Sequence, residues 1–327
     1  TAYDDPAEMS ARIAAAAQTT GIGLTLLPVL YRRGSLDNRP VSGGQVRFGC
    51  TRDRYEALMA SAEKAMFQLD ADCNLGVAPH SLRAVSAQDL SWVQDLRPGL
   101  PVHIHIAEQT AEIADVEAAY GARPVEWLLD TIAVDARWCL VHATHMTAVE
   151  VAGLAASGSV AGLCPVTECN LGDGIFAGAE FLNQGGRIGI GSDSNVRICL
   201  AEELRTLEYS QRLRDQRRVV LTQDGLSVGR TLFSAACRGG AQATNRGTGQ
   251  IATGQLADLV TLDSAAIHTS GLSGDTLLDG WIFAGDDSLV RDVFSAGRHL
   301  VSEGVHKNRA AIIGGFRRTL EKLRAEL

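Results

Sequence analysis

Short apolar runs alternate with amphipathic stretches along the first two thirds of the chain. The length and composition of the runs predict strands at 22–31, 75–80, 101–107, 138–144, 159–165 and 187–194. Helical periodicity predicts helices at 6–18, 53–69, 87–96, 110–120, 146–156 and 178–184, with a further helix starting at Pro124. Strands that alternate with helices are typical of a parallel sheet with right-handed crossovers.

Polar side chains gather at the carboxyl ends of the predicted strands. They are His80, His105 with Glu108, His142, Glu168 and Asp193. Functional groups at this end of successive strands favour a TIM-type (β/α)8 barrel. An open doubly wound sheet is the competing architecture, but it would not usually place polar groups at every strand end. The chain also contains no glycine-rich phosphate-binding fingerprint.

After Asp193 the pattern changes. Helices are predicted at 200–214 and 223–239, and the chain then becomes strand-like and punctuated by glycine. The stretch "VRDVFSAGRHLVSEG" predicts a hairpin that turns at Ala296-Gly297. We therefore divide the chain into a barrel domain (1–245), a small β-sandwich part (246–305) and a C-terminal amphipathic helix (306–327).

Composition narrows the class of protein. Hydrophobic residues make up 46% and charged residues 21% of the 327 positions, which is typical of a globular enzyme. The net charge of −8, without a basic block, argues against a nucleic-acid or membrane partner. The seven cysteines are scattered and form no C-x-x-C motif, which indicates reduced, buried thiols in a cytoplasmic protein.

Histidines and carboxylates that converge at strand ends suit zinc or ferrous iron. Such a metal lowers the pKa of bound water, and a nearby glutamate can then carry a proton. Each residue also has an ordinary interpretation: Glu108 could interact with a helix dipole, Glu168 could cap a loop, and Asp193 could be an N-cap. For the other five histidines we expect structural roles in which the ring is hydrogen-bonded. They are His103, His145, His268, His299 and His306.

Several motifs together carry a family resemblance. The segments "HIHIAEQ", "LVHATH", "CPVTECNLGDGIF" and "GIGSDSNVRI" resemble the deaminase branch of the amidohydrolase superfamily. The segments "GLTLLPVLY" and "APHSLRAV" are similar to members that deiminate N-formimino-L-glutamate, and "GQIATGQLADLVTLD" resembles the return of the chain to the small β-sandwich. The resemblance covers nearly the whole chain.

The resemblance implies a role for each candidate residue. His105 and Asp193 would bind one divalent metal ion, zinc or iron, and Glu108 would be the proton shuttle. His142 and Asp193 would contact the hydrolytic water or the tetrahedral centre. His80 and Arg83 would bind the carboxylates of the substrate, because an arginine fork suits a carboxylate; a surface salt bridge is the alternative for Arg83.

The implied activity is hydrolytic deimination of N-formimino-L-glutamate in histidine degradation, by a cytoplasmic homodimer. Two alternatives stay open: a deaminase acting on a purine, pyrimidine or triazine, and a catalytically silent binding protein. The family's metal site starts with an H-x-H pair at the end of the first strand, and no such pair precedes residue 103. We therefore expect this chain to lack the first two barrel strands and the leading half of the sandwich.

Overall fold

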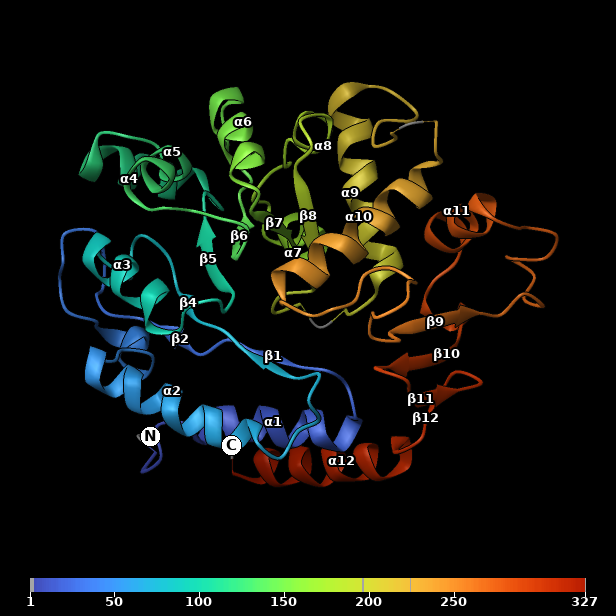
Figure 1. Ribbon diagram of the computed structural model, residues 1–327, viewed down its shortest axis with the longest axis horizontal. Coiled ribbons are helices and arrows are strands. Elements are labelled where there is room, and N and C mark those ends of the chain that lie inside the picture. The colour runs from blue at the N-terminus through green and yellow to red at the C-terminus, as the bar shows by residue number, and fades with distance from the viewer. Residues whose placement is uncertain (1–2, 196, 224, 327) are drawn as a thin grey trace.

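Six parallel strand segments lie side by side, in chain order, in the computed structural model of residues 3–195, 197–223 and 225–326 (Figure 1). The first segment consists of two short strands, β1 (Thr25–Leu26) and β2 (Val29–Leu30), and the second of β3 (Asn74–Leu75) and β4 (Ala78–Pro79). The other four segments are β5 (Val102–Ile106), β6 (Trp138–His142), β7 (Val160–Leu163) and β8 (Arg187–Ile190). β1 pairs with β3 and β2 with β4, and β5 to β8 form one continuous sheet. The bridges Val77–Val102 and Ser81–His105 join the second segment to β5. This order is that of a TIM-type barrel wall.

One helix precedes the first strand of this wall, and others connect successive strands on its outer side (Figure 1). They are α1 (Glu8–Thr20), α2 (Arg52–Met66), α3 (Ala87–Leu96), α4 (Thr110–Tyr120), α5 (Pro124–Thr131), α6 (Ala148–Ser157), α7 (Pro165–Leu171) and α8 (Gly178–Asn183). Side-chain caps explain several helix starts, since Thr51, Ser86 and Thr147 each accept a hydrogen bond from the backbone N–H three residues later. The alternation along β5 places Val102, Ile104 and Ile106 in the core, so His103 and His105, which lie between them, point to the opposite, inner face.

Two long helices follow β8, namely α9 (Leu200–Asp215) and α10 (Val228–Ala243). α10 packs directly on β8, and this contact requires a glycine at its closest point. A Cβ atom at Gly239 would lie 1.9 Å from the carbonyl oxygen of Ile188, so no larger residue fits without displacing the strand. At the neighbouring Gly240, a Cβ atom would meet nothing within 4 Å.

The rest of the chain forms an antiparallel sheet and two more helices. The sheet has the order β12 (Val305–His306), β11 (Arg298–Ser302), β10 (Val290–Ser295) and β9 (Leu259–Leu262). Its β10–β11 hairpin turns at Ala296 and Gly297, whose φ angles of 46° and 80° are those of a type I′ turn. The helix α12 (Arg309–Ala325) runs beside α1 (Figure 1), to which His306 and Asn308 are tied by hydrogen bonds to Thr20 and Thr19.

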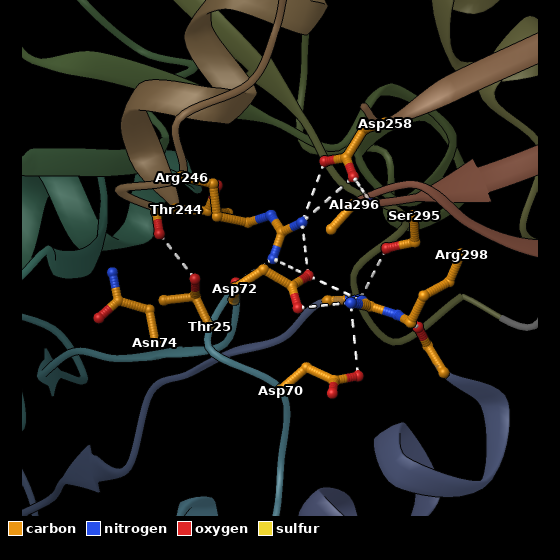
Figure 2. Close-up of polar contacts among 12 residues, drawn as sticks. Thr25, Asp70, Asp72, Asn74, Thr244, Arg246, Asp258, Ser295, Ala296 and Arg298 are labelled. Atoms are coloured by element: carbon orange, nitrogen blue, oxygen red, sulfur yellow. Dashed lines mark hydrogen bonds and ion pairs between the residues drawn. The ribbon is translucent and has the colours of Figure 1, made fainter. Parts of the chain in front are cut away.

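A buried ionic network joins the antiparallel sheet to the barrel wall (Figure 2). Asp72, in the loop before β3, pairs with Arg298 of β11 at 2.8 Å and with Arg246, after α10, at 3.1 Å. Arg246 also pairs with Asp258 at 3.0 Å, and Asp258 accepts the backbone N–H of Ala296 in the hairpin. The side chain of Asp72 is 3% exposed, so the loop, the α10 terminus and the hairpin meet at one shielded carboxylate.

The predicted barrel strands, hairpin and C-terminal helix are confirmed, with differences in detail. The runs at 22–31 and 75–80 are each split into two short strands, and the helix predicted at 223–239 lies at 228–243. The helix α11 (Asp275–Ala284) was not predicted, and it packs on α9 and α10. Residues 1, 2, 196, 224 and 327 lie outside the described residues, and with them parts of the helices predicted at 223–239 and 306–327.

Within the described residues, neither β8 nor the β1–β2 segment pairs with a further parallel strand, so the wall has two free edges. None of the helices in the described ranges is long and apolar enough to cross a membrane.

Candidate active site

The end of β5 presents a histidine whose ring is fixed by its neighbour in the wall. Nδ1 of His105 lies 2.9 Å from the carbonyl oxygen of His80, which can only accept a hydrogen bond. Nδ1 therefore carries the proton and Nε2 keeps a free lone pair. This arrangement is typical of a metal-binding histidine, in which the second nitrogen orients the ring.

His142, at the end of β6, lies between two carboxylates. Its ring centre is 5.7 Å from that of His105. Nδ1 of His142 is 3.2 Å from Oε1 of Glu168, and Nε2 is 3.7 Å from Oε1 of Glu108. Burial lowers the pKa of His142, but the hydrogen bond to Glu168 and the charges of Glu108, Glu168 and Asp193 outweigh burial, and the net pKa is raised. The carboxylates around His142 therefore favour a protonated imidazole, or a neutral one that donates a hydrogen bond to them.

The backbone at these strand ends is strained. Ala107, His142, Ala143 and Asp193 all have positive φ values, at 52°, 70°, 48° and 51°. Such conformations are unfavourable for residues other than glycine and concentrate at functional sites. The strain turns the chain sharply after β5 and β6, and it places Glu108 near His142.

Asp193 lies in the loop after β8, three residues beyond the last strand residue, and is exposed. Its Oδ2 accepts a hydrogen bond from Oγ of Ser194 at 3.1 Å. The negative charge of Asp193 also contributes to the raised pKa of His142. The structure thus brings His105, Glu108, His142 and Asp193 to one end of the wall, as the sequence predicts.

The predicted carboxylate-binding pair lies beside this group. The His80 ring is 5.0 Å from the His105 ring and 4.8 Å from the Tyr31 ring. Burial, His105 and Arg83 lower the pKa of His80 to about 4, so His80 is neutral at pH 7. Within the described residues, Arg83 makes no hydrogen bond or ion pair, although its charge acts on His80 and on the buried Glu112. The salt bridge considered as its alternative role is not formed there.

Of the five histidines that were assigned hydrogen-bonded structural roles, four have partners. The fifth, His268, is exposed and has no side-chain hydrogen bond within the described residues. Nε2 of His103 bonds the carbonyl oxygen of Ala243 at 2.7 Å, and Nε2 of His145 bonds that of Asp173 at 2.6 Å. His306 bonds Thr20, and His299 pairs with Asp292 at 2.9 Å. His103 therefore links β5 to the end of α10.

All seven cysteines are free thiols, as predicted, but burial is confirmed only for Cys139, Cys164 and Cys199. Cys50, Cys73 and Cys237 are half-buried, and Cys169 is exposed. Cys164 lies next to the site, and His142, Cys164 and Glu168 offer ligand atoms within 4.8 Å of one another. Sequence reasoning missed the contact of Glu168 with His142, and nothing in the spacing of these two residues could have revealed it. Burial raises the pKa of the Cys164 thiol, which makes it a poor thiolate ligand.

The donor types of His105 and Asp193 suit the metal that the strand-end pattern predicts. The free Nε2 of His105 and the exposed carboxylate of Asp193 are the donor types that zinc and iron accept. Nδ1 of His142 contacts Glu168, and its Nε2 lies 3.7 Å from Oε1 of Glu108, which agrees with the role beside the metal that the resemblance implies.

Comparison with known proteins identifies a family and a similar enzyme. Residues 8–300 match the model of the Amidohydrolase family. A formimidoylglutamate deiminase from Pseudomonas aeruginosa is 50% identical over 325 residues, which are 98% of this chain and 71% of that protein.

Two solved structures have the same fold. An amidohydrolase from Brucella melitensis matches with a TM-score of 0.93 and 46% identity, over 99% of this chain and 71% of that one. An adenosine deaminase from Xanthomonas campestris with bound zinc matches with a TM-score of 0.80 and 25% identity, over 96% and 70%. The family match and the relatives, together with the strand-end site, show that the chain belongs to the amidohydrolase family, whose members are hydrolases.

Proposed function

We propose that this protein hydrolyses N-formimino-L-glutamate to N-formyl-L-glutamate and ammonia. The observation that carries the proposal is the 50% identity, over 98% of the chain, to a formimidoylglutamate deiminase. The site agrees with it, because a proton carrier, a hydrogen-bonding histidine and a free arginine lie together at the strand ends. The overall reaction replaces the imino nitrogen of the substrate by the oxygen of water, and that nitrogen leaves as ammonia.

One divalent metal ion, zinc or iron, would be held by His105 and Asp193 and, when bound, would lower the pKa of the attacking water. The residues of this chain do the rest. Glu108, with its carboxylate beside His142, would accept a proton from the water and deliver it to the departing nitrogen. His142 would hydrogen-bond to the tetrahedral centre, and Asp193 would orient the water.

Arg83 and His80 would bind the glutamate part of the substrate. The guanidinium of Arg83 supplies positive charge and two parallel N–H donors for a carboxylate. His80 is neutral because of its lowered pKa, so it would contribute a hydrogen bond rather than a charge. Its Nδ1 already contacts Oγ of Ser81 at 3.1 Å, which leaves Nε2 for the substrate.

Other features of the function are proposals of the same kind. We infer a small dicarboxylate as the substrate, with no nucleic-acid or membrane partner, and a cytoplasmic homodimer in histidine degradation. The second candidate is a nucleoside deaminase, which the adenosine deaminase among the structural relatives favours. A catalytically silent protein is the third candidate.

An ammonia-release assay separates these candidates. The zinc-loaded and iron-loaded proteins are given N-formimino-L-glutamate, adenosine and N-formyl-L-glutamate at equal concentrations. The proposal expects ammonia from N-formimino-L-glutamate alone. Ammonia from adenosine alone would favour the nucleoside deaminase, and ammonia from none of them would favour the silent protein.

A further inference from the structure

We propose that Glu168 is a positioning residue that fixes the ring orientation and tautomer of His142 for the deimination reaction. The proposal rests on the proposed function of this site. It goes beyond that function because it assigns Glu168 a role through His142 rather than through contact with the substrate or the reacting atoms. Glu168 acts through its contact with Nδ1 of His142.

One oxygen atom of Glu168 contacts two hydrogen-bond donors. Oε1 of Glu168 accepts the backbone N–H of Cys164 at 2.8 Å and also lies 3.2 Å from Nδ1 of His142. An ionised carboxylate can only accept hydrogen bonds, so Nδ1 of His142 must carry a proton. In the neutral ring, Nε2 is then the acceptor, and Nε2 is the atom that faces Glu108 at 3.7 Å.

Burial makes this contact rigid. The residues His142 and Glu168 are 1% and 4% exposed, so water cannot readily replace either partner. Glu168 lies in the first turn of α7, where the helix dipole favours a carboxylate. The positive φ of His142 adds a reason for external support, because a strained backbone persists only when its surroundings hold it.

A second buried carboxylate provides a matched control. Glu203 of α9 accepts the backbone N–H of Val166 at 2.9 Å, in the same turn of α7, and makes no contact with His142. Burial raises the pKa of Glu203 to about 7, so its charge is already partly lost at neutral pH. An amide at this position is therefore a small change that tests support of α7 alone.

The experiment compares Glu168→Leu, Glu168→Gln and Glu203→Gln with the parent protein. The leucine variant removes the acceptor, and we expect kcat for N-formimino-L-glutamate to fall by about 10–100-fold with KM and bound metal unchanged. The glutamine variant should retain most activity, because the N–H of Cys164 attracts the amide oxygen, and this oxygen can then serve both donors. The Glu203→Gln variant should behave like the parent.

The ring tautomer gives a readout that does not depend on turnover. Isotope-edited NMR of the histidine ring nitrogens, at a pH where the ring is neutral, should find the proton of His142 on Nδ1 in the parent and in Glu168→Gln. In Glu168→Leu the proton should move at least partly to Nε2. If the leucine variant does not fold, the tautomer in the parent protein decides alone.

Three results would overturn the proposal. They are a parent tautomer with the proton on Nε2, an unchanged kcat in folded Glu168→Leu, and loss of metal from that variant, which would make Glu168 a ligand. A parent protein that releases no ammonia from N-formimino-L-glutamate would instead refute the proposed function, and the tautomer measurement would still test the role of Glu168.

Discussion

The carbonyl oxygen of His80 accepts a hydrogen bond from Nδ1 of His105 at 2.9 Å. The two residues belong to neighbouring strand segments, joined by the bridge between Ser81 and His105. One backbone atom therefore fixes both the register of the barrel wall and the ring nitrogen that is free to bind metal. The adjacent side chain of His80, in turn, faces the proposed substrate site.

Glu108→Gln should keep the bound metal and lose most turnover. The amide still fits beside His142 but cannot carry a proton, and general acid–base steps contribute roughly 10²–10⁴-fold to rates. Metal content and kcat are measured together. Glu117→Gln, on the exposed face of α4, the helix that follows Glu108, is the control and should leave both values unchanged. Loss of metal from Glu108→Gln would show that Glu108 is a ligand.

Arg83→Met should raise KM for N-formimino-L-glutamate much more than it changes kcat or metal content. A lost charge-assisted hydrogen bond to a carboxylate weakens binding by about 1.5–3 kcal/mol. Arg97→Met is the control, because Arg97 forms an ion pair with Glu63 at 3.5 Å on the helical layer. If both variants keep the parent KM, Arg83 is not the carboxylate anchor.

Gly239→Ala should destabilise the fold, whereas Gly240→Ala should not. The added methyl group at Gly239 would strike the carbonyl oxygen of Ile188, and overpacking of this kind costs about 1–3 kcal/mol. At Gly240 the methyl group meets open space, and alanine is the better helix former by up to about 1 kcal/mol. Urea unfolding of the two variants gives the comparison. Equal stability of both would contradict the close packing of α10 on β8.

Asp72→Asn should destabilise the protein at neutral pH, by roughly 3 kcal/mol, because it breaks a buried ion pair. The hydrogen bond from Arg298, together with Arg246, lowers the pKa of Asp72 despite its burial. A lowered folded-state pKa stabilises the fold above the unfolded pKa of about 3.9, and this stabilisation is lost as the pH falls through the folded value.

The difference in unfolding free energy between the parent and Asp72→Asn should therefore shrink from pH 7 towards pH 3. Asp70→Asn is the control, since Asp70 is exposed and lies 3.4 Å from the same Arg298, and surface pairs contribute up to about 1 kcal/mol. A difference between the parent and Asp72→Asn that stays constant over this pH range would mean that the charge of Asp72 does not stabilise the fold.

The barrel wall and most of the site could be predicted because both depend on local patterns. The histidines of β5 alternate with buried isoleucines, and parallel strands bring their carboxyl ends to one edge. The hairpin was predictable for the same reason, since Ala296-Gly297 lies between strand-like runs.

The split of the first strand run into β1 and β2 was missed although its signal is local, since Pro28 has no N–H. Other features depend on tertiary contacts and were not predictable. The apolar residues of α11 read as part of a β-rich region, and the helix is stabilised by Trp281 packing on Phe233. The Glu168–His142 contact depends on a left-handed backbone at His142, which no local pattern encodes.

Product analysis in water enriched in the heavy oxygen isotope tests the central claim most directly. The metal-loaded protein is incubated with N-formimino-L-glutamate, and the products are identified by mass spectrometry. Hydrolytic deimination predicts one ammonia for each N-formyl-L-glutamate, with one heavy oxygen atom in the formyl group. Glutamate with labelled formamide, or unconverted substrate, would contradict the claim.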